Sequence, residues 1–158
     1  MSETETKRCR NTRRVLIALF IVCGYMLSTT YAVDYVEIQG KETLVEMTAL
    51  NLAFGAMGGS LPMRSNIVIG LLFIFLPLLG FFFMFFDKKT NIKNFVGIGC
   101  GLIGMMSIML FIGANIGIGA LVSVLCYLVI TILSAVAVLM HAQDKRAVSA
   151  PKLKKHTE

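Results

Sequence analysis

The sequence predicts an all-α membrane protein: a bundle of four transmembrane helices with a small extracytoplasmic segment between the first two. Three observations predict it. Of the 158 residues, 56% are hydrophobic and only 15% are charged, whereas soluble domains carry about 25% charged residues. The mean hydropathy is +0.78. The charged residues are also confined to short segments that separate long charge-free runs.

Three charge-free runs set the number of spans, at residues 15–33, 65–86 and 94–143. The hydrocarbon core of a bilayer is about 30 Å thick and needs roughly 20 apolar helical residues, so the first two runs match one span each. The third run is too long for one helix and must turn back, and a cluster of glycines at 113–119 predicts the turn. The predicted helices cover residues 14–33, 66–86, 95–113 and 118–141.

The positions of lysine and arginine predict the orientation of these spans. Of the 15 basic residues, the segment 34–65 contains only Lys41 and Arg64, beside four acidic residues. Every other basic residue lies on the opposite side of a four-span bundle, which the positive-inside rule places in the cytoplasm. We therefore expect a membrane domain at 14–141, an extracytoplasmic segment at 34–65, and cytoplasmic basic tails at 1–13 and 142–158.

A second interpretation of the first run is a cleaved secretory signal peptide. Residues 7–14 are basic, an apolar stretch follows, and the small-residue end at 30–32 resembles a cleavage site. Cleavage after Ala32 would leave three spans in the same orientation. The apolar run continues through Val33, which favours a helix that stays part of the protein.

The sequence of the extracytoplasmic segment predicts an initial β-strand and leaves the residues after it open between a return strand, which would make a β-hairpin, and a helix. Residues 34–39 alternate between polar and apolar side chains, Gly40 and Lys41 can form a turn, and 43–48 can be the return strand. The alternative for the second half is an amphipathic helix over 42–54. Because an isolated two-stranded hairpin is only marginally stable in water, we expect the hairpin to lie on the bundle or on a partner.

The third predicted span carries a face of small residues. Its glycines recur at spacings of four and three, and the first pair forms a G-x-x-x-G pattern. Small residues let two helix backbones approach closely in lipid. We expect this face to pack against another helix, and we expect Leu at the second position to disrupt the bundle. The helix-packing residues are Gly97, Gly101 and Gly104.

The fourth predicted span carries a polar stripe on one face. Hydroxyl groups in lipid seek hydrogen-bond partners, so the stripe predicts either contacts between helices or the lining of a polar pathway. In the second span, a mid-helix proline lacks a backbone donor and predicts a kink. The residues are Ser123, Tyr127, Thr131 and Ser134 in the stripe, and Pro77 at the kink.

The same residues argue against an enzyme. No acidic or basic side chain lies in the interior of a predicted span, where ion-coupled pumps and proton relays need one. The sequence contains no phosphate-binding loop, zinc-protease motif or serine-hydrolase motif. We expect no cofactor, no metal and no nucleic-acid partner. The basic clusters beside the span ends are instead suited to anionic lipids at the cytoplasmic face of the bilayer.

Two functions remain. The first is a non-enzymatic accessory or scaffold subunit, which binds another membrane protein through the outer segment or the glycine face, or associates with itself. The second is a homo-oligomeric pore or transporter for a neutral or weakly polar solute, which the proline and the polar stripe support. Hydroxyls around a shared axis would favour the pore, and their burial within one protomer would favour the scaffold. The outer segment has no N-x-S/T glycosylation site, which favours the cytoplasmic membrane of a bacterium.

Overall fold

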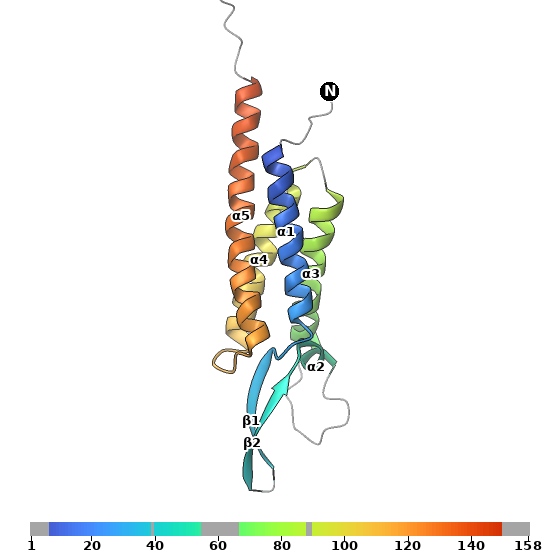
Figure 1. Ribbon diagram of the computed structural model, residues 1–158, viewed down its shortest axis with the longest axis vertical. Coiled ribbons are helices and arrows are strands. Elements are labelled where there is room, and N and C mark those ends of the chain that lie inside the picture. Colours follow the sequence, from blue (N-terminus) through green and yellow to red (C-terminus); the bar gives the residue numbers. More distant parts are fainter. Residues whose placement is uncertain (1–6, 39, 55–66, 88–89, 150–158) are drawn as a thin grey trace, which may run out of the picture.

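Four long helices form a bundle, and a β-hairpin extends from one end of it (Figure 1). The computed structural model describes residues 7–38, 40–54, 67–87 and 90–149. The elements in this part of the chain are α1 (Lys7–Met26), β1 (Ala32–Ile38), β2 (Lys41–Met47), α2 (Ala49–Phe54), α3 (Ile67–Phe86), α4 (Ile92–Phe111) and α5 (Ile118–Ser149).

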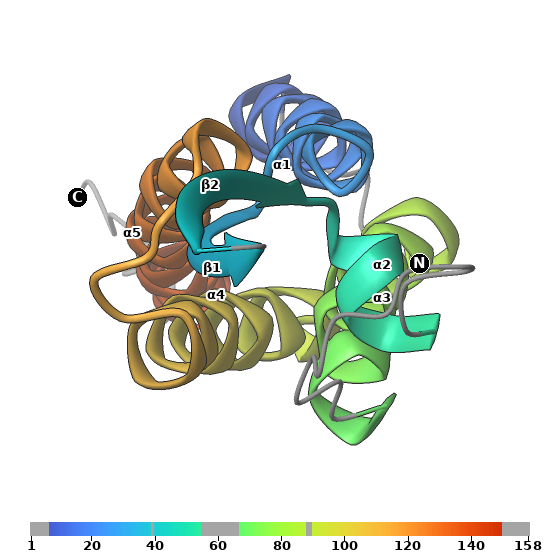
Figure 2. The same ribbon diagram turned by 90° about the horizontal axis from the view of Figure 1, so that it is seen from below.

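The long helices occupy the corners of a four-sided bundle (Figure 2). α1 and α4 each pack against both α3 and α5, and the short helix α2 packs on α3. Successive long helices run in opposite directions, so the start of α1, the end of α3, the start of α4 and the end of α5 meet at one end (Figure 1). The basic residues of the described segments, other than Lys41 in the hairpin, therefore lie toward the end opposite the hairpin.

The predicted initial strand is confirmed, and of the two alternatives for the residues that follow it, the return strand is the one that forms. β1 and β2 pair antiparallel, from Ala32 opposite Met47 to Ile38 opposite Lys41. At the turn, Gly40 has φ +76°, a conformation that glycine adopts without steric strain. The alternative helix over 42–54 is wrong for its first half, because residues up to Met47 are in β2, and only α2 is helical.

Among the helices of the described residues, two are long and apolar enough to span a bilayer, namely α4 and the part of α5 from Ile118 to Gln143. The prediction of four spanning helices is not supported for α1 and α3. α1 begins inside the basic segment and ends at Met26, so its charge-free part is about 18 Å long at 1.5 Å per residue. In α3 the shorter apolar segment Gly70–Phe86 is found, within a helix of 20 residues that equals α4 in length.

The boundary predicted at residue 33 for the first helix is wrong, because α1 ends at Met26. Hydroxyl groups satisfy the last carbonyls of the helix: Ser28 Oγ donates to Tyr25 O at 2.8 Å, and Thr29 Oγ1 donates to Met26 O at 2.7 Å. The chain then enters β1. An apolar, charge-free run does not by itself distinguish a helix from a strand.

The remaining boundaries lie closer to the predictions. α3 and α4 match the predicted helices within three residues at each end, and the predicted turn is confirmed, with Gly113 at φ +59°. α5 continues to Ser149, past the predicted end at residue 141. Residues 55–65 of the predicted extracytoplasmic segment and residues 150–158 of the predicted tail lie outside the described residues.

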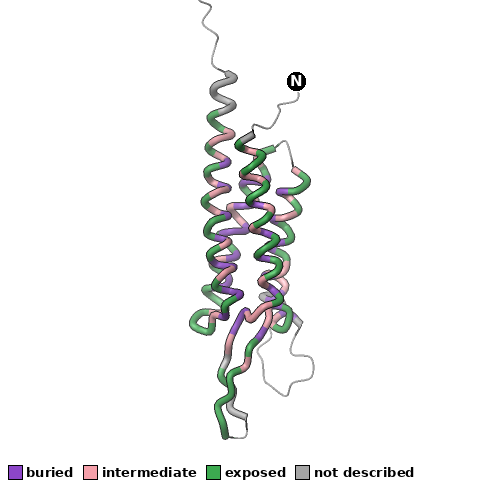
Figure 3. Tube along the Cα trace, in the orientation of Figure 1, coloured by how far each residue is buried: buried purple, intermediate pink, exposed green. Residues whose placement is uncertain are grey.

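The interior and the surface of the bundle differ in the size and polarity of their side chains. The surface of every long helix exposes large apolar side chains, among them Ile21, Phe82, Leu110 and Leu139. The buried positions face the middle of the bundle (Figure 3) and include glycines, cysteines and serines as well as Phe and Leu. Small and polar residues are thus enriched inside, and bulky hydrocarbon is enriched outside.

Candidate functional site

The predicted glycine face and the predicted hydroxyl stripe pack against each other. On α4, a Cβ atom built at each of the three glycines would overlap the side chain of one stripe residue of α5. We call this contact the seam. Its three pairs are Gly97 with Ser134, Gly101 with Thr131, and Gly104 with Tyr127.

At the seam, α4 and α5 approach each other so closely that the three glycine positions of α4 have no room for a side chain larger than hydrogen. A Cβ at Gly101 would overlap Thr131 Oγ1 and lie 2.9 Å from the carbonyl oxygen of Tyr127. A Cβ at Gly104 would lie 2.7 Å from Cε2 of the Tyr127 ring. Gly99, on the same helix, would meet nothing within 4 Å. The requirement for glycine is therefore specific to the predicted face.

The hydroxyls of the seam fill space more than they join helices. Thr131 Oγ1 donates to the carbonyl oxygen of Tyr127 at 2.8 Å, within its own helix. Ser134 Oγ is completely buried and has no hydrogen-bond partner. The same holds for Ser123 Oγ, the stripe residue that follows Tyr127 toward the hairpin. Hydrogen bonds between helices, which the stripe predicted, are therefore not made by these three residues.

Pro77 is buried inside α3, and the helix continues through it. The predicted kink stays a prediction. One turn further along, a Cβ at Gly80 would overlap the ring of Phe20 from α1, and at the start of the helix a Cβ at Gly70 would overlap the backbone of Ala53 in α2. These two glycines were missed because they stand alone in an apolar run.

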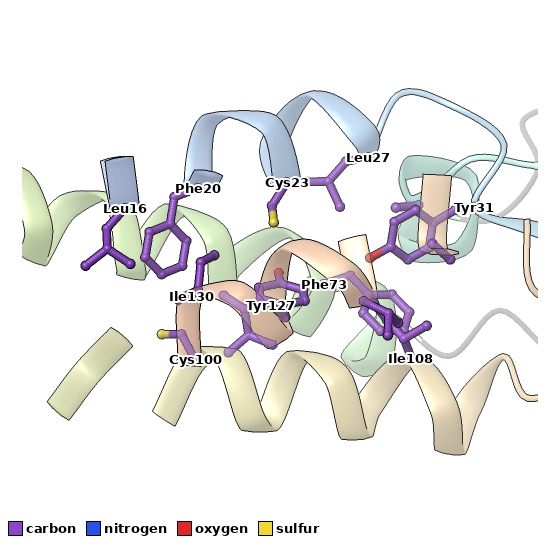
Figure 4. Close-up of a cluster of buried hydrophobic side chains, with 14 of the residues drawn as sticks. Leu16, Phe20, Cys23, Leu27, Tyr31, Phe73, Cys100, Ile108, Tyr127 and Ile130 are labelled. Atoms are coloured by element: carbon purple, nitrogen blue, oxygen red, sulfur yellow. The ribbon is translucent and has the colours of Figure 1, made fainter. Parts of the chain in front are cut away.

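α1 supplies a large share of the hydrophobic core (Figure 4). Leu16, Phe20, Cys23 and Leu27 are all buried and lie on one side of α1, at spacings of three and four. In the close-up they point toward α5, where Tyr127 lies near the centre of the cluster. α1 is therefore an integral part of the bundle and not an appendage to it.

A ring of backbone contacts joins the hairpin to the bundle, and we call it the collar. It consists of residues 27–33, 47–49 and 115–119. Its hydrogen bonds run from Val33 N to Asn115 O (2.9 Å), Gly117 N to Tyr31 O (3.0 Å), Gly119 N to Thr30 O (2.8 Å), Tyr31 N to Met47 O (2.7 Å) and Ala49 N to Leu27 O (3.1 Å).

The collar depends on two glycines near the start of α5. A Cβ at Gly117 would overlap the carbonyl oxygen of Thr30, and a Cβ at Gly119 would lie 2.9 Å from the carbonyl oxygen of Met26 and overlap Thr29 Oγ1. The amide of Gly119 is also one of the donors at a helix start that lack a partner within the helix, and Thr30 satisfies it. The sequence indicated these glycines only as a turn.

Tyr31 connects the collar to the core. Its side chain is 1% exposed, and its ring centroid lies 5.3 Å from that of Phe73. Burial raises the pKa of Tyr31 above its usual value, and the neighbouring Ser123 hydroxyl opposes that shift only in part. The two hydroxyls make no hydrogen bond of normal geometry, since Ser123 Oγ has no partner. Tyr31 therefore remains neutral at physiological pH and anchors the collar mainly by packing.

The hairpin itself is largely exposed. Tyr35 and Leu44, directly opposite each other, are 70% and 51% exposed. Glu42 and Glu46 are also exposed, and Glu46 accepts a hydrogen bond from Thr30 Oγ1 at 2.6 Å. The collar thus holds the base of the hairpin, while Tyr35, Glu42 and Leu44 are exposed beyond it.

Within the described segments, no three His, Cys, Asp or Glu residues are grouped so that they could hold a metal ion. Comparisons with protein-family models, with curated proteins and with solved structures gave no match. The functional inference therefore rests on the residues of this chain alone.

Proposed function

We propose that this chain is a multi-pass membrane protein with four spanning helices, and that it serves as a non-enzymatic accessory or scaffold subunit of a membrane complex. The observation that carries the proposal is the seam. A pore would need the hydroxyl stripe to face an open axis. In this chain the stripe packs against the glycine face of α4 instead.

The exposed surfaces of α1 and α3 support their inclusion among the spans. α1 exposes Ile21 and Tyr25, and α3 exposes Phe75, Phe82 and other rings, in the same manner as α4 and α5. A contiguous apolar surface of this extent is unusual on a soluble monomer. A bilayer adapts to a short span by local thinning or by moving flanking charged side chains to the interface. The short apolar part of α1 is compatible with this adaptation.

The charge distribution supports an orientation with the hairpin outside. The basic segments flank the ends of the helices at one end of the bundle, and the positive-inside rule places that end in the cytoplasm. Anionic lipid headgroups there would attract Lys and Arg by about 1 kcal/mol per residue. Both termini are then cytoplasmic, and the cytoplasmic membrane of a bacterium remains the location that we propose.

The core supports an uncleaved first helix. Removal of the chain up to Ala32 would take away Leu16, Phe20 and Tyr31, each no more than 1% exposed. It would also remove the acceptors that hold Gly117 and Gly119 in the collar. The three helices left behind would lose the α1 side of the hydrophobic core.

The pore remains the alternative. It would require several copies to surround a polar axis, yet the outer surfaces of the bundle are apolar and the hydroxyls lie within one chain. The buried, unpartnered hydroxyls of Ser123 and Ser134 are the one observation in its favour, because polar groups without partners occur along hydrated paths.

Native mass spectrometry tests the proposal directly. The protein, tagged at its C-terminus, is purified gently from its own membranes. We expect the uncleaved chain together with a different membrane protein in fixed stoichiometry. A homo-oligomer without a companion would overturn the accessory role and favour the pore. A mass lacking the first 32 residues would show that the chain is cleaved after Ala32, and that it has three spanning helices instead of four.

Cysteine labelling tests the topology. In a variant with Cys9 replaced by Ser, we introduce Glu42→Cys in the hairpin or Gln143→Cys near the other end, both exposed positions. A membrane-impermeant maleimide added to intact cells should label position 42 at once. Position 143 should be labelled only after permeabilisation. The same labelling at both positions without permeabilisation would contradict the four-span arrangement.

A further inference from the structure

We propose that the hairpin is the surface on which the partner docks, and that the docking segment of the partner pairs a basic side chain with an apolar one. This inference rests on the proposed accessory function and adds the place and the chemistry of the contact. The occupant is an extracytoplasmic segment of another membrane protein.

The strand register brings an apolar pair and an acidic pair to one face of the hairpin. Tyr35 is opposite Leu44, and Glu37 is opposite Glu42. The two pairs are two residues apart on each strand, so they lie on the same face of the sheet. Like charges directly opposite each other destabilise an antiparallel pair. A cation placed beside Glu37 and Glu42 would remove that repulsion.

The charge of the hairpin decides between occupants. Residues 32–47 contain four acidic residues and one basic residue. A second copy of the chain would bring an equally acidic hairpin, and an anionic lipid surface would also be repelled. A positively charged partner is attracted, and an arginine can make bidentate hydrogen bonds to a carboxylate. The neighbouring Tyr35 and Leu44 offer the apolar contact that an interface centre needs.

The collar prepares this surface for binding. Five backbone hydrogen bonds and the buried Tyr31 fix the base of the hairpin on the bundle. A surface that is already ordered loses less conformational entropy when it binds. The hairpin is therefore presented in one orientation, although its outer half has no support from the helices (Figure 1).

Site-specific photo-crosslinking tests the proposal in the full-length protein in its own membranes. The photoreactive residue p-benzoylphenylalanine replaces Tyr35, and in a matched control it replaces Tyr25, an outward-facing tyrosine of α1 that is 66% exposed. We expect a protein adduct from position 35, at a peptide of the partner that contains Arg or Lys. No such adduct is expected from position 25.

Charge reversal makes the test specific. Glu42→Lys should lower the yield of the adduct at least about tenfold, because attraction becomes repulsion. Thr43→Lys introduces a lysine on the opposite face of β2, with a charge change of one unit instead of two, and should have less than half the effect of Glu42→Lys. Reversal of the basic residue identified in the partner should restore the adduct with Glu42→Lys. Thermal unfolding of each variant confirms that the bundle is intact.

Several outcomes would overturn the proposal. They are an adduct only with lipid or a second copy, an adduct insensitive to Glu42→Lys, and no adduct at all. Native mass spectrometry of the protein without Glu42→Lys separates the two proposals. A companion that is bound while position 35 gives no adduct refutes the hairpin as the docking surface and leaves the accessory role standing. The absence of any companion from the unmodified protein refutes both.

Discussion

The seam and the hairpin differ in whether their side chains are contacted by the rest of the chain. In the seam, each glycine of α4 receives a side chain of α5, and the contact is closed within the chain. In the hairpin, the register places an acidic pair beside Tyr35 and Leu44, which are 70% and 51% exposed. The contrast is the basis of the proposal that a partner docks on the hairpin and not on the helices.

The largest expected effect comes from breaking the seam. Gly101→Leu places a branched side chain against Thr131 and the backbone of Tyr127, and overpacking of this kind costs about 3 kcal/mol or more when backbone must move. We expect the variant to lose the bundle in a titration with denaturing detergent. Gly99→Leu, at an open position, is the matched control. Equal midpoints for the two variants would contradict the seam.

A smaller effect is expected from loosening the collar. Gly119→Val would crowd Thr29 and the carbonyl of Met26, with an expected loss of about 1–3 kcal/mol. Hydrogen exchange should speed up at the amides of Val33 and Gly117, because their acceptors shift. Gly24→Val, with open space around it, is the control. Unchanged exchange at both amides would show that the collar does not depend on this glycine.

Within the seam, removal of the two hydroxyl groups should change the stability of the bundle in different directions. Ser134→Ala removes a buried oxygen that has no hydrogen-bond partner, so stability should stay equal or rise by up to about 1 kcal/mol. Thr131→Val removes the hydrogen bond to Tyr127 O and should lower stability by about 0.5 kcal/mol. Detergent titrations of both variants measure the difference. A clear loss with Ser134→Ala would indicate a partner for that hydroxyl, such as a buried water.

The smallest effect is expected on the hairpin. Tyr35→Ser changes a side chain that is 70% exposed and should alter the stability of the bundle by less than about 0.5 kcal/mol. The same change should weaken association with the partner. A large loss of bundle stability would mean that the ring of Tyr35 supports the fold, and the contrast between the two regions would fail.

The sequence was informative where spacing alone decides the structure. Gly97, Gly101 and Gly104 share a helix face by their spacing, and the same is true of the α5 hydroxyls, so each stripe could be predicted. Their contact with each other could not, because it depends on how α4 and α5 are rotated. The end of α1 was missed because hydroxyl groups near Met26 end the helix inside an apolar run.

The collar could not be predicted for a different reason. Its bonds join segments that are far apart in sequence, and most of them use backbone groups, which every residue type carries. Only the glycines at 117 and 119 hinted at a close approach, and a turn explained them equally well. The first strand and the turn of the hairpin were predictable, since alternation and Gly40 are local features, whereas the sequence leaves the second strand open against a helix. The position of the hairpin on the bundle is set by the collar and was not predictable.

The collar also constrains how the protein is made. Val33 and Gly117 belong to segments separated by about 80 residues, and translation at roughly 5–20 residues per second takes several seconds to cover that distance. During this interval, α1 and the hairpin have been synthesised, but Asn115, Gly117 and Gly119 have not yet emerged to hold them. The hairpin therefore acquires its fixed orientation only when the last helix arrives. Until then, only the collar bonds among residues 27–33 and 47–49 can hold its base.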